Sequence, residues 1–385
     1  MFKRTLALLC LLAMMLSCWG CSADPGDHSD ISTSTVPTYS TKDPTIAGSV
    51  RYVNPNPALQ AAWEKIAGNY TRETGIKVQI IPAENAEGIT PTLFTVENGA
   101  QLEPLVDVCV DLASSKATHH VQNWSLTLYS GNKMCGLPLE AEGYGLIYNE
   151  DVLRQAGVLA ADITSFAKLR EVISNIAANS ALEFEAFACV DMESPVIGLL
   201  SALPGDIRPF WDLYANNSAC DDAISENDDP ILKVANSEAA FCLSSTTDGE
   251  VLANMCDGML NIMPLYIGMD NEDRQGLCVR VENYLCVRND VPQVDIDATL
   301  DFLDYLTHPQ DGKIPVDQLA VFTPYSTATY FASPLEKTLR EHISTAKSLL
   351  VFPDITAPKG LGDALKTYTA DPTDKNWEAV SKLLK

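Results

Sequence analysis

Two short segments place acidic and aromatic side chains two residues apart, a pattern that suits contact with a polar solute. In one, Glu142 and Tyr144 alternate along an extended run, so both side chains point to the same face. In the other, Glu282 and Tyr284 share a face, and Asn283 points to the opposite one. Carboxylates and amides make directional, often bidentate hydrogen bonds to hydroxyl groups, and aromatic faces stack on the apolar faces of sugar rings. These residues are therefore candidates for hydrogen-bonding and stacking contacts with a polar ligand.

Catalytic signatures are absent from the sequence. The chain contains no GxSxG, HExxH or Walker loop, so we expect no enzymatic activity and no cofactor. His119 and His120 are the only adjacent histidine pair, and neighbouring side chains diverge in direction. A transition-metal site needs three or four converging ligands, and the sequence alone indicates none. We therefore expect a surface histidine pair and no metal.

The composition is that of an acidic globular protein. Of the 385 residues, 46% are hydrophobic and 20% are charged, and the formal net charge is -25. This charge argues against nucleic acid or anionic lipid as a partner and suits neutral or cationic solutes. Its simplest explanation is solubility outside the cell. The length favours two domains over one.

The first residues have the layout of a secretory signal peptide. Lys3 and Arg4 precede an apolar run of about a dozen residues, which is shorter than the roughly 20 needed to span a bilayer. The run ends in LSCWGCSAD, which resembles the lipobox of bacterial lipoproteins. We expect residues 1–20 to be removed and Cys21 to carry the lipid, with Cys18 as the alternative. A plain cleaved signal with incidental cysteines remains open.

Two further features follow the signal. Residues 21–46 are rich in Ser, Thr, Asp and Pro and are too polar to bury a core, so we expect a flexible tether. Eight of the eleven cysteines follow the signal region. They lie at wide spacings, several of them in apolar runs, so we expect buried free thiols. Disulfides remain possible outside the cell. The eight are Cys109, Cys135, Cys189, Cys220, Cys242, Cys256, Cys278 and Cys286.

The start of the folded body predicts an α/β architecture. Residues 48–53 form an expected strand, and Asn56 followed by Pro57 is typical of a helix N-terminus. Apolar side chains then recur on one helical face until Gly75 ends the helix. Residues 76–82 follow as a short strand, and this order of strand, helix and strand indicates α/β.

Two segments resemble signatures of the family 1 extracellular solute-binding proteins, the sugar receptors of ABC importers. They are GLPLEAEGYGLIYNEDVLRQAGV at residues 136–158 and GMLNIMPLYIGMDNEDRQGLCVRVENYLCVRND at residues 258–290. The resemblance covers nearly all of the body. It implies an α/β, two-lobe periplasmic-binding-protein-like fold of type II with three crossings between the lobes. The crossings are expected near residues 139–141, 258–265 and 319–324.

The resemblance also implies lobe boundaries. The first lobe is expected to comprise residues 47–139 and 264–320. The second lobe is expected to comprise residues 140–263 and 321–385.

The chain departs from the family pattern in three places, one of which is a shortened stretch near residues 191–206. A helix that members usually carry between the second and third strands has no counterpart between Pro82 and Thr92. Residues 244–248, SSTTD, stand where many relatives carry a Trp that stacks on sugar. Trp124 and Trp211 are candidates to replace it, but we expect both to pack within the fold.

The resemblance assigns a ligand cleft to particular residues. It implies that Glu142 faces the ligand with Tyr144 beside it, and that Glu282, Asn283 and Tyr284 line the same cleft. The other residues that it places there are Asn54, Glu97, Asn98 and Tyr325.

These observations predict a monomeric receptor, lipid-anchored to the outer face of the cytoplasmic membrane, that captures a saccharide and hands it to an ABC permease. We expect no nucleic-acid partner. A degenerate receptor of the same fold, serving sensing or adhesion, is the main alternative, and a surface hydrolase is a further one. The sequence does not name the sugar or its length.

Overall fold

The computed structural model describes residues 48–191, 194–218, 224–225, 229–256, 259–310, 313–325, 333–345, 348–351 and 356–384. The expected signal peptide, the tether, and Cys18 and Cys21 lie outside these residues. Within the described part of the chain, every helix is too short or too polar to cross a membrane.

The described chain opens with the expected strand, helix and strand. Asn56 accepts a hydrogen bond from the backbone N of Ala58 and so begins the helical segment. Gly75 ends it with a φ of 79°, a left-handed conformation that glycine adopts without strain. The first and last strands pair in parallel. The elements are β1 (Ser49–Asn54), η1 (Pro57–Leu59), α2 (Gln60–Thr74) and β2 (Lys77–Pro82).

One mixed sheet of ten strands organises the described residues, in the order β2-β1-β3-β11-β5-β9-β6. β10 and β4 pair with β5 outside this path, and β12 pairs with β11. A separate pair is formed by β7 (Val190–Asp191) and β8 (Ile224–Ser225). The other strands are β3 (Leu93–Val96), β4 (Leu128–Ser130), β5 (Lys133–Asn149), β6 (Glu185–Phe187), β9 (Ala239–Ser245), β10 (Leu260–Met263), β11 (Gln275–Val287) and β12 (Ser348–Val351).

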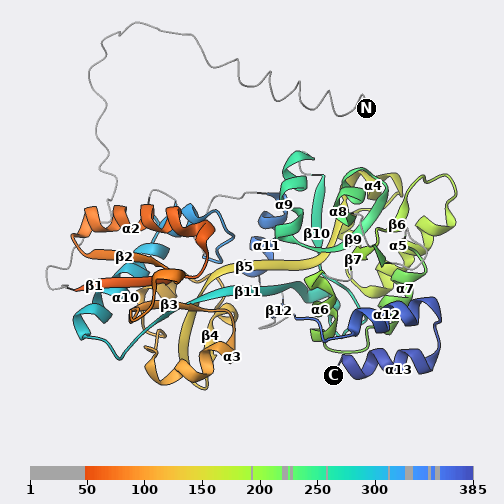
Figure 1. Ribbon diagram of the computed structural model, residues 1–385. Helices are drawn as coiled ribbons and strands as arrows, with labels where there is room; N and C mark the ends of the chain where they lie inside the picture. The colour runs from red at the N-terminus through yellow and green to blue at the C-terminus, as the bar shows by residue number, and fades with distance from the viewer. Residues whose placement is uncertain are drawn as a thin grey trace, which may run out of the picture. The chain divides into compact units, whose positions relative to one another are not determined.

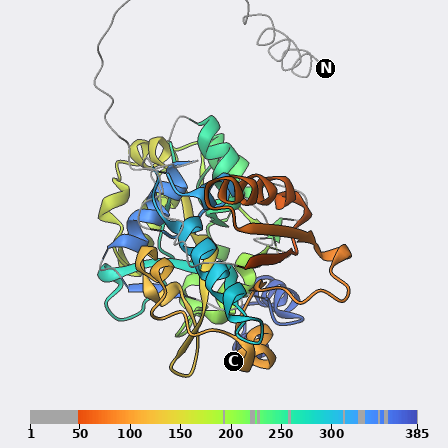
Figure 2. The same ribbon diagram turned by 90° about the vertical axis from the view of Figure 1, so that its left-hand side faces the viewer.

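Helices flank this sheet. Figure 2 faces β1 and β2 and shows α2 and α10 beside them. The other α-helices are α3 (Gly99–Leu102), α4 (Glu150–Gln155), α5 (Phe166–Ala178), α6 (Pro195–Ala202), α7 (Arg208–Ala215), α8 (Pro230–Ala235), α9 (Thr246–Met255), α10 (Gln293–Thr307), α11 (Pro334–Ser344), α12 (Leu361–Ala370) and α13 (Asp374–Leu383). The remaining 3-10 helices are η2 (Ala83–Asn85), η3 (Glu103–Val108), η4 (Lys116–His120), η5 (Trp124–Leu126), η6 (Ala160–Asp162), η7 (Glu272–Arg274) and η8 (Pro315–Leu319).

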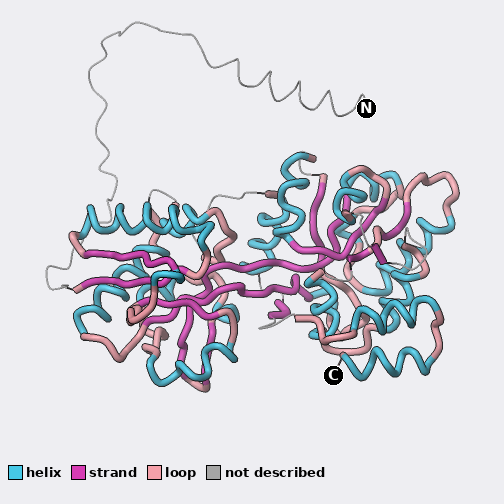
Figure 3. The backbone as a smooth tube through the Cα atoms, viewed as in Figure 1, coloured by secondary structure: helices cyan, strands magenta, loops and turns pink. Residues whose placement is uncertain are grey.

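Two long antiparallel strands join two groups of elements. β5 has 17 residues and β11 has 13, and both continue from one group into the other (Figures 1 and 3). We call the group containing β1, β2, β3, α2 and α10 the first lobe. The group containing β6, β9, β10, α5 and α7 is the second lobe. The α/β, two-lobe architecture predicted from the sequence is therefore confirmed.

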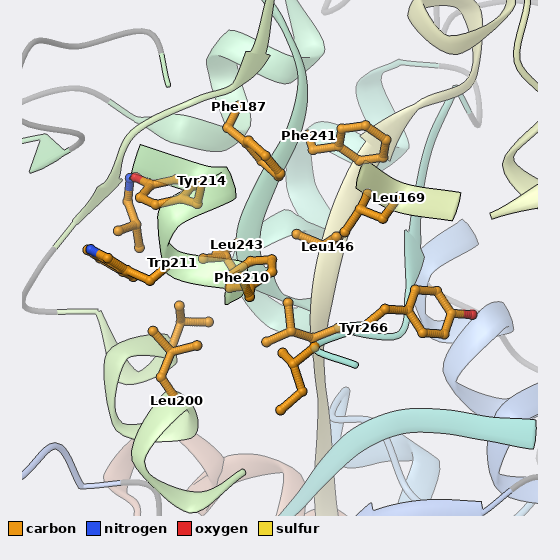
Figure 4. Close-up of a cluster of buried hydrophobic side chains, with 14 of the residues drawn as sticks. Leu146, Leu169, Phe187, Leu200, Phe210, Trp211, Tyr214, Phe241, Leu243 and Tyr266 are labelled. Atoms are coloured by element: carbon orange, nitrogen blue, oxygen red, sulfur yellow. The ribbon is translucent and has the colours of Figure 1, made fainter. Parts of the chain in front are cut away.

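Each lobe has its own apolar core. In the first lobe, Trp63, Tyr70 and Phe302 are fully buried against the strands. In the second lobe, aromatic side chains from β6, α7 and β9 pack together, as Figure 4 shows for Phe187, Phe210, Trp211, Tyr214 and Phe241. A third cluster of buried apolar side chains, which includes Phe94, Val281 and Leu260, extends from the first lobe along the joining strands into the second lobe.

Three segments connect the lobes, and they contact one another. β5 pairs with β11 through Ala141 and Val281. The backbone N of Ala141 also donates to the carbonyl of Phe322, at 3.0 Å, in the segment that follows η8. The hydroxyl of Tyr325 donates to the carbonyl of Pro138 at 2.7 Å. These three chain segments form a compact hinge.

The second crossing differs in position from the sequence expectation. Residues 258–265 were expected to cross, but β10 pairs only with the second-lobe end of β5, and Gly258 itself lies outside the described residues. Leu265 and Cys278 are buried in the core of the second lobe. Short apolar runs of similar composition follow one another here, and only β11 is long enough to reach both lobes. We propose that residues 264–279 belong to the second lobe and keep the other expected boundaries.

Other sequence expectations meet mixed outcomes. Only η2 lies between β2 and β3, so the shortened connection is present. Trp211 is buried and donates to Thr369 at 2.9 Å, whereas Trp124, which we expected inside, is 53% exposed. Five described cysteines are buried free thiols, Cys256 is half-buried, and Cys189 is disulfide-bonded. The buried five are Cys109, Cys135, Cys242, Cys278 and Cys286.

Candidate functional site

The acidic residues predicted from two distant segments meet on adjacent strands at the hinge. Glu142 on β5 lies opposite Arg280 on β11, and Glu140 lies opposite Asn283. The ladder shifts register around residues 281–284, an irregularity of the kind that redirects side chains. Because the side chains of these four residues are all half-buried, they combine access to solvent with partial desolvation.

Glu142 and Tyr144 share one face of β5, as their spacing predicted. The hydroxyl of Tyr144 donates to Oε2 of Glu142 at 2.5 Å. Tyr144 itself is 2% exposed and packs in the core of the second lobe. The tyrosine therefore orients the Glu142 carboxylate from the buried side, while the half-buried carboxylate keeps partial access to solvent.

Glu282 pairs with a single arginine in an otherwise acidic surrounding. Its Oε2 lies 3.2 Å from Nη2 of Arg280. Burial raises the pKa of Glu282 to about 7, and the carboxylates of Glu142 and Glu140 add to this rise, while the Arg280 guanidinium opposes it. Near neutral pH, Glu282 therefore exists in both protonated and ionised forms and can donate or accept a hydrogen bond.

Glu140 adds a third carboxyl group to this cluster. Burial and the charge of Glu142 raise its pKa, while a hydrogen bond with Asn283 lowers it. Sequence reasoning missed Glu140 and Arg280, although each lies two residues from a predicted site residue on an extended run. We call Glu140, Glu142, Arg280, Glu282 and Asn283 the hinge cluster.

The N-terminus of α9 lies beside the hinge cluster and carries the SSTTD stretch. The hydroxyl of Thr246 accepts a hydrogen bond from the backbone N of Gly143 at 3.0 Å. Ser245 caps the helix by accepting from the backbone N of Asp248 at 3.1 Å. Burial and the charge of Glu142 raise the pKa of Asp248. Hydroxyl and carboxyl groups thus lie at the N-terminus of α9, beside the hinge cluster.

Glu97 and Asn98 lie close to the hinge cluster, but their side chains form hydrogen bonds with a residue of the same chain segment. Val96, just before them, pairs with Tyr284 on β11. Asn98 caps α3 by accepting from the backbone N of Gln101, and Oε2 of Glu97 accepts from the Gln101 side chain. They therefore border the candidate site, with part of their hydrogen-bonding capacity already engaged.

Three further predicted residues are held in the interior. Asn54 is 1% exposed, and its amide donates to the carbonyl of Asn56 and to the side chain of Gln60. Tyr284 is 3% exposed, and Tyr325 is fully buried with its hydroxyl bound to the Pro138 carbonyl. In this structure these residues hold loops and strands in place and present no surface to a solute. Burial of this kind depends on long-range packing that local sequence does not reveal.

A small pocket lies beside the third crossing segment. Its volume is about 110 Å³, and it is bordered by α9 through Glu250 and by α11 through Glu336 and Arg340. Arg340 is buried and donates to the carbonyls of Tyr325 and Thr323, so it fastens the crossing segment to α11.

Solved structures share this fold across most of the chain. The bacterial solute receptor AcbH, described as having an exclusive preference for β-D-galactopyranose, matches with a TM-score of 0.68 and 13% identity over 88% of this chain and 97% of its own. The solute-binding protein RafE in complex with raffinose matches with a TM-score of 0.58 and 16% identity, over 88% of this chain and 98% of its own. A family 1 extracellular solute-binding protein from Bifidobacterium longum subsp. infantis matches with a TM-score of 0.62 and 14% identity, over 88% of this chain and 98% of its own.

Comparison of the amino-acid sequence with protein families and with curated proteins finds no match. At the identities above, the solved structures establish the fold, which is the two-lobe fold of extracellular solute-binding proteins.

Proposed function

We propose that this protein is an extracellular receptor that captures a carbohydrate in the hinge cluster and presents it to the permease of an ABC importer. The observation that carries this proposal is the meeting of Glu142 with Glu282 and Asn283. They come from distant parts of the sequence and lie half-buried on the two strands that join the lobes. Closure of two lobes on a hinge is a general way to bury a ligand between half-sites.

The chemistry of the hinge cluster suits a neutral, polyhydroxylated ligand. Carboxylates and amides accept or donate directional hydrogen bonds to hydroxyl groups. Glu282 contributes both roles because its pKa is about 7. The similar structures named for galactopyranose and raffinose support the same ligand class. Enzymatic activity is not part of the proposal, and the absence of glycoside turnover by the purified protein would be consistent with it.

The membrane anchor is a separate part of the proposal and rests on the sequence alone. The LSCWGC segment supports lipid attachment at Cys21, with Cys18 as the alternative. We expect the mature protein to take up a fatty-acid label in growing cells. Replacing both cysteines should release the protein into the medium, and a label that persists in the double variant would contradict the anchor.

Calorimetry on a sugar panel tests the binding proposal. The panel should contain galactose, raffinose and stachyose, with the first saccharide that raises the melting temperature used for titration. Saturation at about 100 times the dissociation constant adds roughly 2.7 kcal/mol of apparent stability. Glu142→Gln keeps an acceptor for Tyr144 but removes the charge. Because charged acceptors form stronger hydrogen bonds by about 1–2 kcal/mol, affinity should fall roughly fivefold to thirtyfold.

A matched variant separates this effect from a general charge effect. Glu84→Gln removes one exposed carboxylate from η2, and we expect it to leave sugar affinity unchanged. The melting temperature of the ligand-free protein should change little in either variant. Equal affinities for Glu142→Gln and wild type would remove Glu142 from the site.

One observation favours a second candidate function. Ser244, Ser245 and Thr246 are buried, and this stretch offers no aromatic platform beside Glu142. An aromatic contact contributes roughly 0.5–1.5 kcal/mol beyond area burial. If no saccharide shifts the melting curve, the degenerate receptor with a role in sensing or adhesion becomes the better explanation.

A further inference from the structure

Three side chains of metal-binding type converge in the first lobe. His120 ends η4, and Asp304 and His308 lie at the end of α10. One ligand atom from each residue lies within 4.8 Å of the other two. Nε2 of His120 is 3.5 Å from Oδ1 of Asp304, and the centroids of the His120 and His308 rings are 5.3 Å apart. None of these residues belongs to the hinge cluster.

The backbone holds the three residues in this arrangement. Asp304 and His308 are four residues apart, so they occupy one face of the helix end. The backbone N of His308 donates to the carbonyl of Asp304 at 2.8 Å and fixes the turn. On the other side, η4 is held by Thr118, which is fully buried and donates to the carbonyl of Leu112 at 2.6 Å. The side chains therefore need only small rotations to share one ion.

Asp304 gives an independent reason to expect a cation. It is 7% exposed, and its Oδ1 is buried and forms no hydrogen bond of good geometry with the described residues. A buried carboxylate is costly unless it is paired or coordinates a metal. Its Oδ1 lies 3.5 Å from Nε2 of His120, and this contact is an ion pair only when the imidazole is protonated.

We propose that His120, Asp304 and His308 bind one divalent transition-metal ion of the Zn²⁺ type, with water completing the coordination. Zn²⁺ takes imidazole nitrogen and carboxylate oxygen at about 2.0–2.2 Å in tetrahedral sites, which places neighbouring ligands roughly 3.3–3.5 Å apart. The His120–Asp304 separation of 3.5 Å already meets this value. Rotation of the His308 side chain brings in the third ligand.

The ligand set explains why the sequence did not reveal it. The sequence predicted a surface histidine pair without a metal; His119 is indeed exposed and is not part of the cluster, whereas His120 is half-buried within it. The companions lie on a helix far along the chain. Val121, next to His120, bridges to Tyr325 in the third crossing segment. The ion would therefore link η4 to α10 beside the hinge, and this holds whether or not the protein binds sugar.

Titration with Zn²⁺ tests the proposal. The full chain is purified without a polyhistidine tag, stripped with a chelator and titrated with ZnCl₂ in a calorimeter. We expect one equivalent to bind and to raise the melting temperature. His120→Gln and His308→Gln should each weaken that binding at least tenfold, while His119→Gln, at the exposed neighbour, should bind as wild type does. Melting of the metal-free variants confirms that each one folds.

Co²⁺ supplies a second readout that is independent of stability. Binding at this site should produce a visible absorption band in the wild type and in His119→Gln, and the band should be lost in His308→Gln. The proposal fails if the wild type binds no Zn²⁺. It also fails if His120→Gln and His308→Gln bind Zn²⁺ as tightly as wild type, because the ion would then be bound elsewhere, for example at thiols.

Discussion

The same two strands meet different surroundings along their length. Where β5 and β11 run through the first lobe, Cys135 and Cys286 are fully buried. At the hinge, a few residues away, Glu142 and Glu282 are half-buried and acidic. The backbone pairing of the two strands runs from the Cys278–Tyr144 pair to the Leu285–Leu137 pair, with register shifts around residues 281–284. The contrast teaches that a strand pair becomes a candidate binding surface where its side chains are acidic and half-buried and its ladder is irregular.

The largest expected effect on stability comes from disturbing the close packing of β5 against β10 in the second lobe. A Cβ at Gly145 would lie 2.2 Å from the carbonyl oxygen of Met263, on the neighbouring strand β10. Because backbone cannot move as a side chain does, Gly145→Ala should cost at least the roughly 1–3 kcal/mol typical of overpacking. Urea unfolding of wild type and variant measures this loss.

A second glycine provides the control for that experiment. Gly68 lies within α2, and nothing lies within 4 Å of an added Cβ. Since alanine favours a helix over glycine by up to about 1 kcal/mol, Gly68→Ala should stabilise the protein slightly. Equal behaviour of the two variants would mean that β5 and β10 do not pack as closely as described.

The next effect concerns the hinge cluster and depends on pH. The pKa of Glu282 rises from 4.5 to about 7 on folding, so the folded protein holds this proton more tightly than the unfolded chain. The associated stability is fully present below pH 4.5 and is lost as the pH rises through about 7. Glu282→Gln removes this loss. Relative to wild type, the variant should gain about 1–3 kcal/mol at pH 8 over its difference at pH 4.

Denaturant unfolding of both proteins across this range measures the difference. Using the difference between variant and wild type cancels the titration of groups that lie far from Glu282. If the two free energies of unfolding differ by a constant amount from pH 4 to pH 8, Glu282 is not desolvated at the hinge. The contrast with the fully buried stretch of β5 and β11 in the first lobe would then be weaker.

An effect of comparable size is expected where the third segment joins the strand pair. Tyr325→Phe removes the hydroxyl that binds the Pro138 carbonyl and leaves a buried acceptor unpaired. The free energy of unfolding should fall by about 1–3 kcal/mol. Tyr129→Phe, at a side chain that is 45% exposed, should change it by less than about 0.5 kcal/mol. Thermal melts of the two variants would contradict the prediction if they shifted equally.

Local patterns predicted the elements well. Asn56, Pro57 and Gly75 marked the first helix because capping and left-handed turns depend on nearby residues only. Alternation placed Glu142 and Tyr144 on one face for the same reason. The resemblance between whole segments then predicted the two-lobe fold.

Long-range packing could not be predicted in the same way. Asn54 and Tyr325 were expected at a ligand, but each is enclosed by segments distant in sequence. The second crossing was placed at residues 258–265 because composition does not distinguish β10 from β11, whereas strand length and pairing do. The convergence of His120 with α10 depends on tertiary structure alone.

The smallest expected effect is a difference in thiol reactivity, and it tests the buried stretch of β5 and β11 in the first lobe. A hydrogen bond with Cys286 lowers the pKa of the Cys109 thiol, which would favour reaction if reagents could reach it. Cys109, Cys135 and Cys286 are nevertheless fully buried, whereas Cys256 is half-buried. Brief alkylation of the folded protein, followed by mass spectrometry, should therefore modify Cys256 well before these three. In denaturant all four should react. Modification of Cys135 or Cys286 at the rate of the half-buried Cys256 would show that β5 and β11 open readily in the first lobe, and the distinction between the buried stretch and the hinge would be lost.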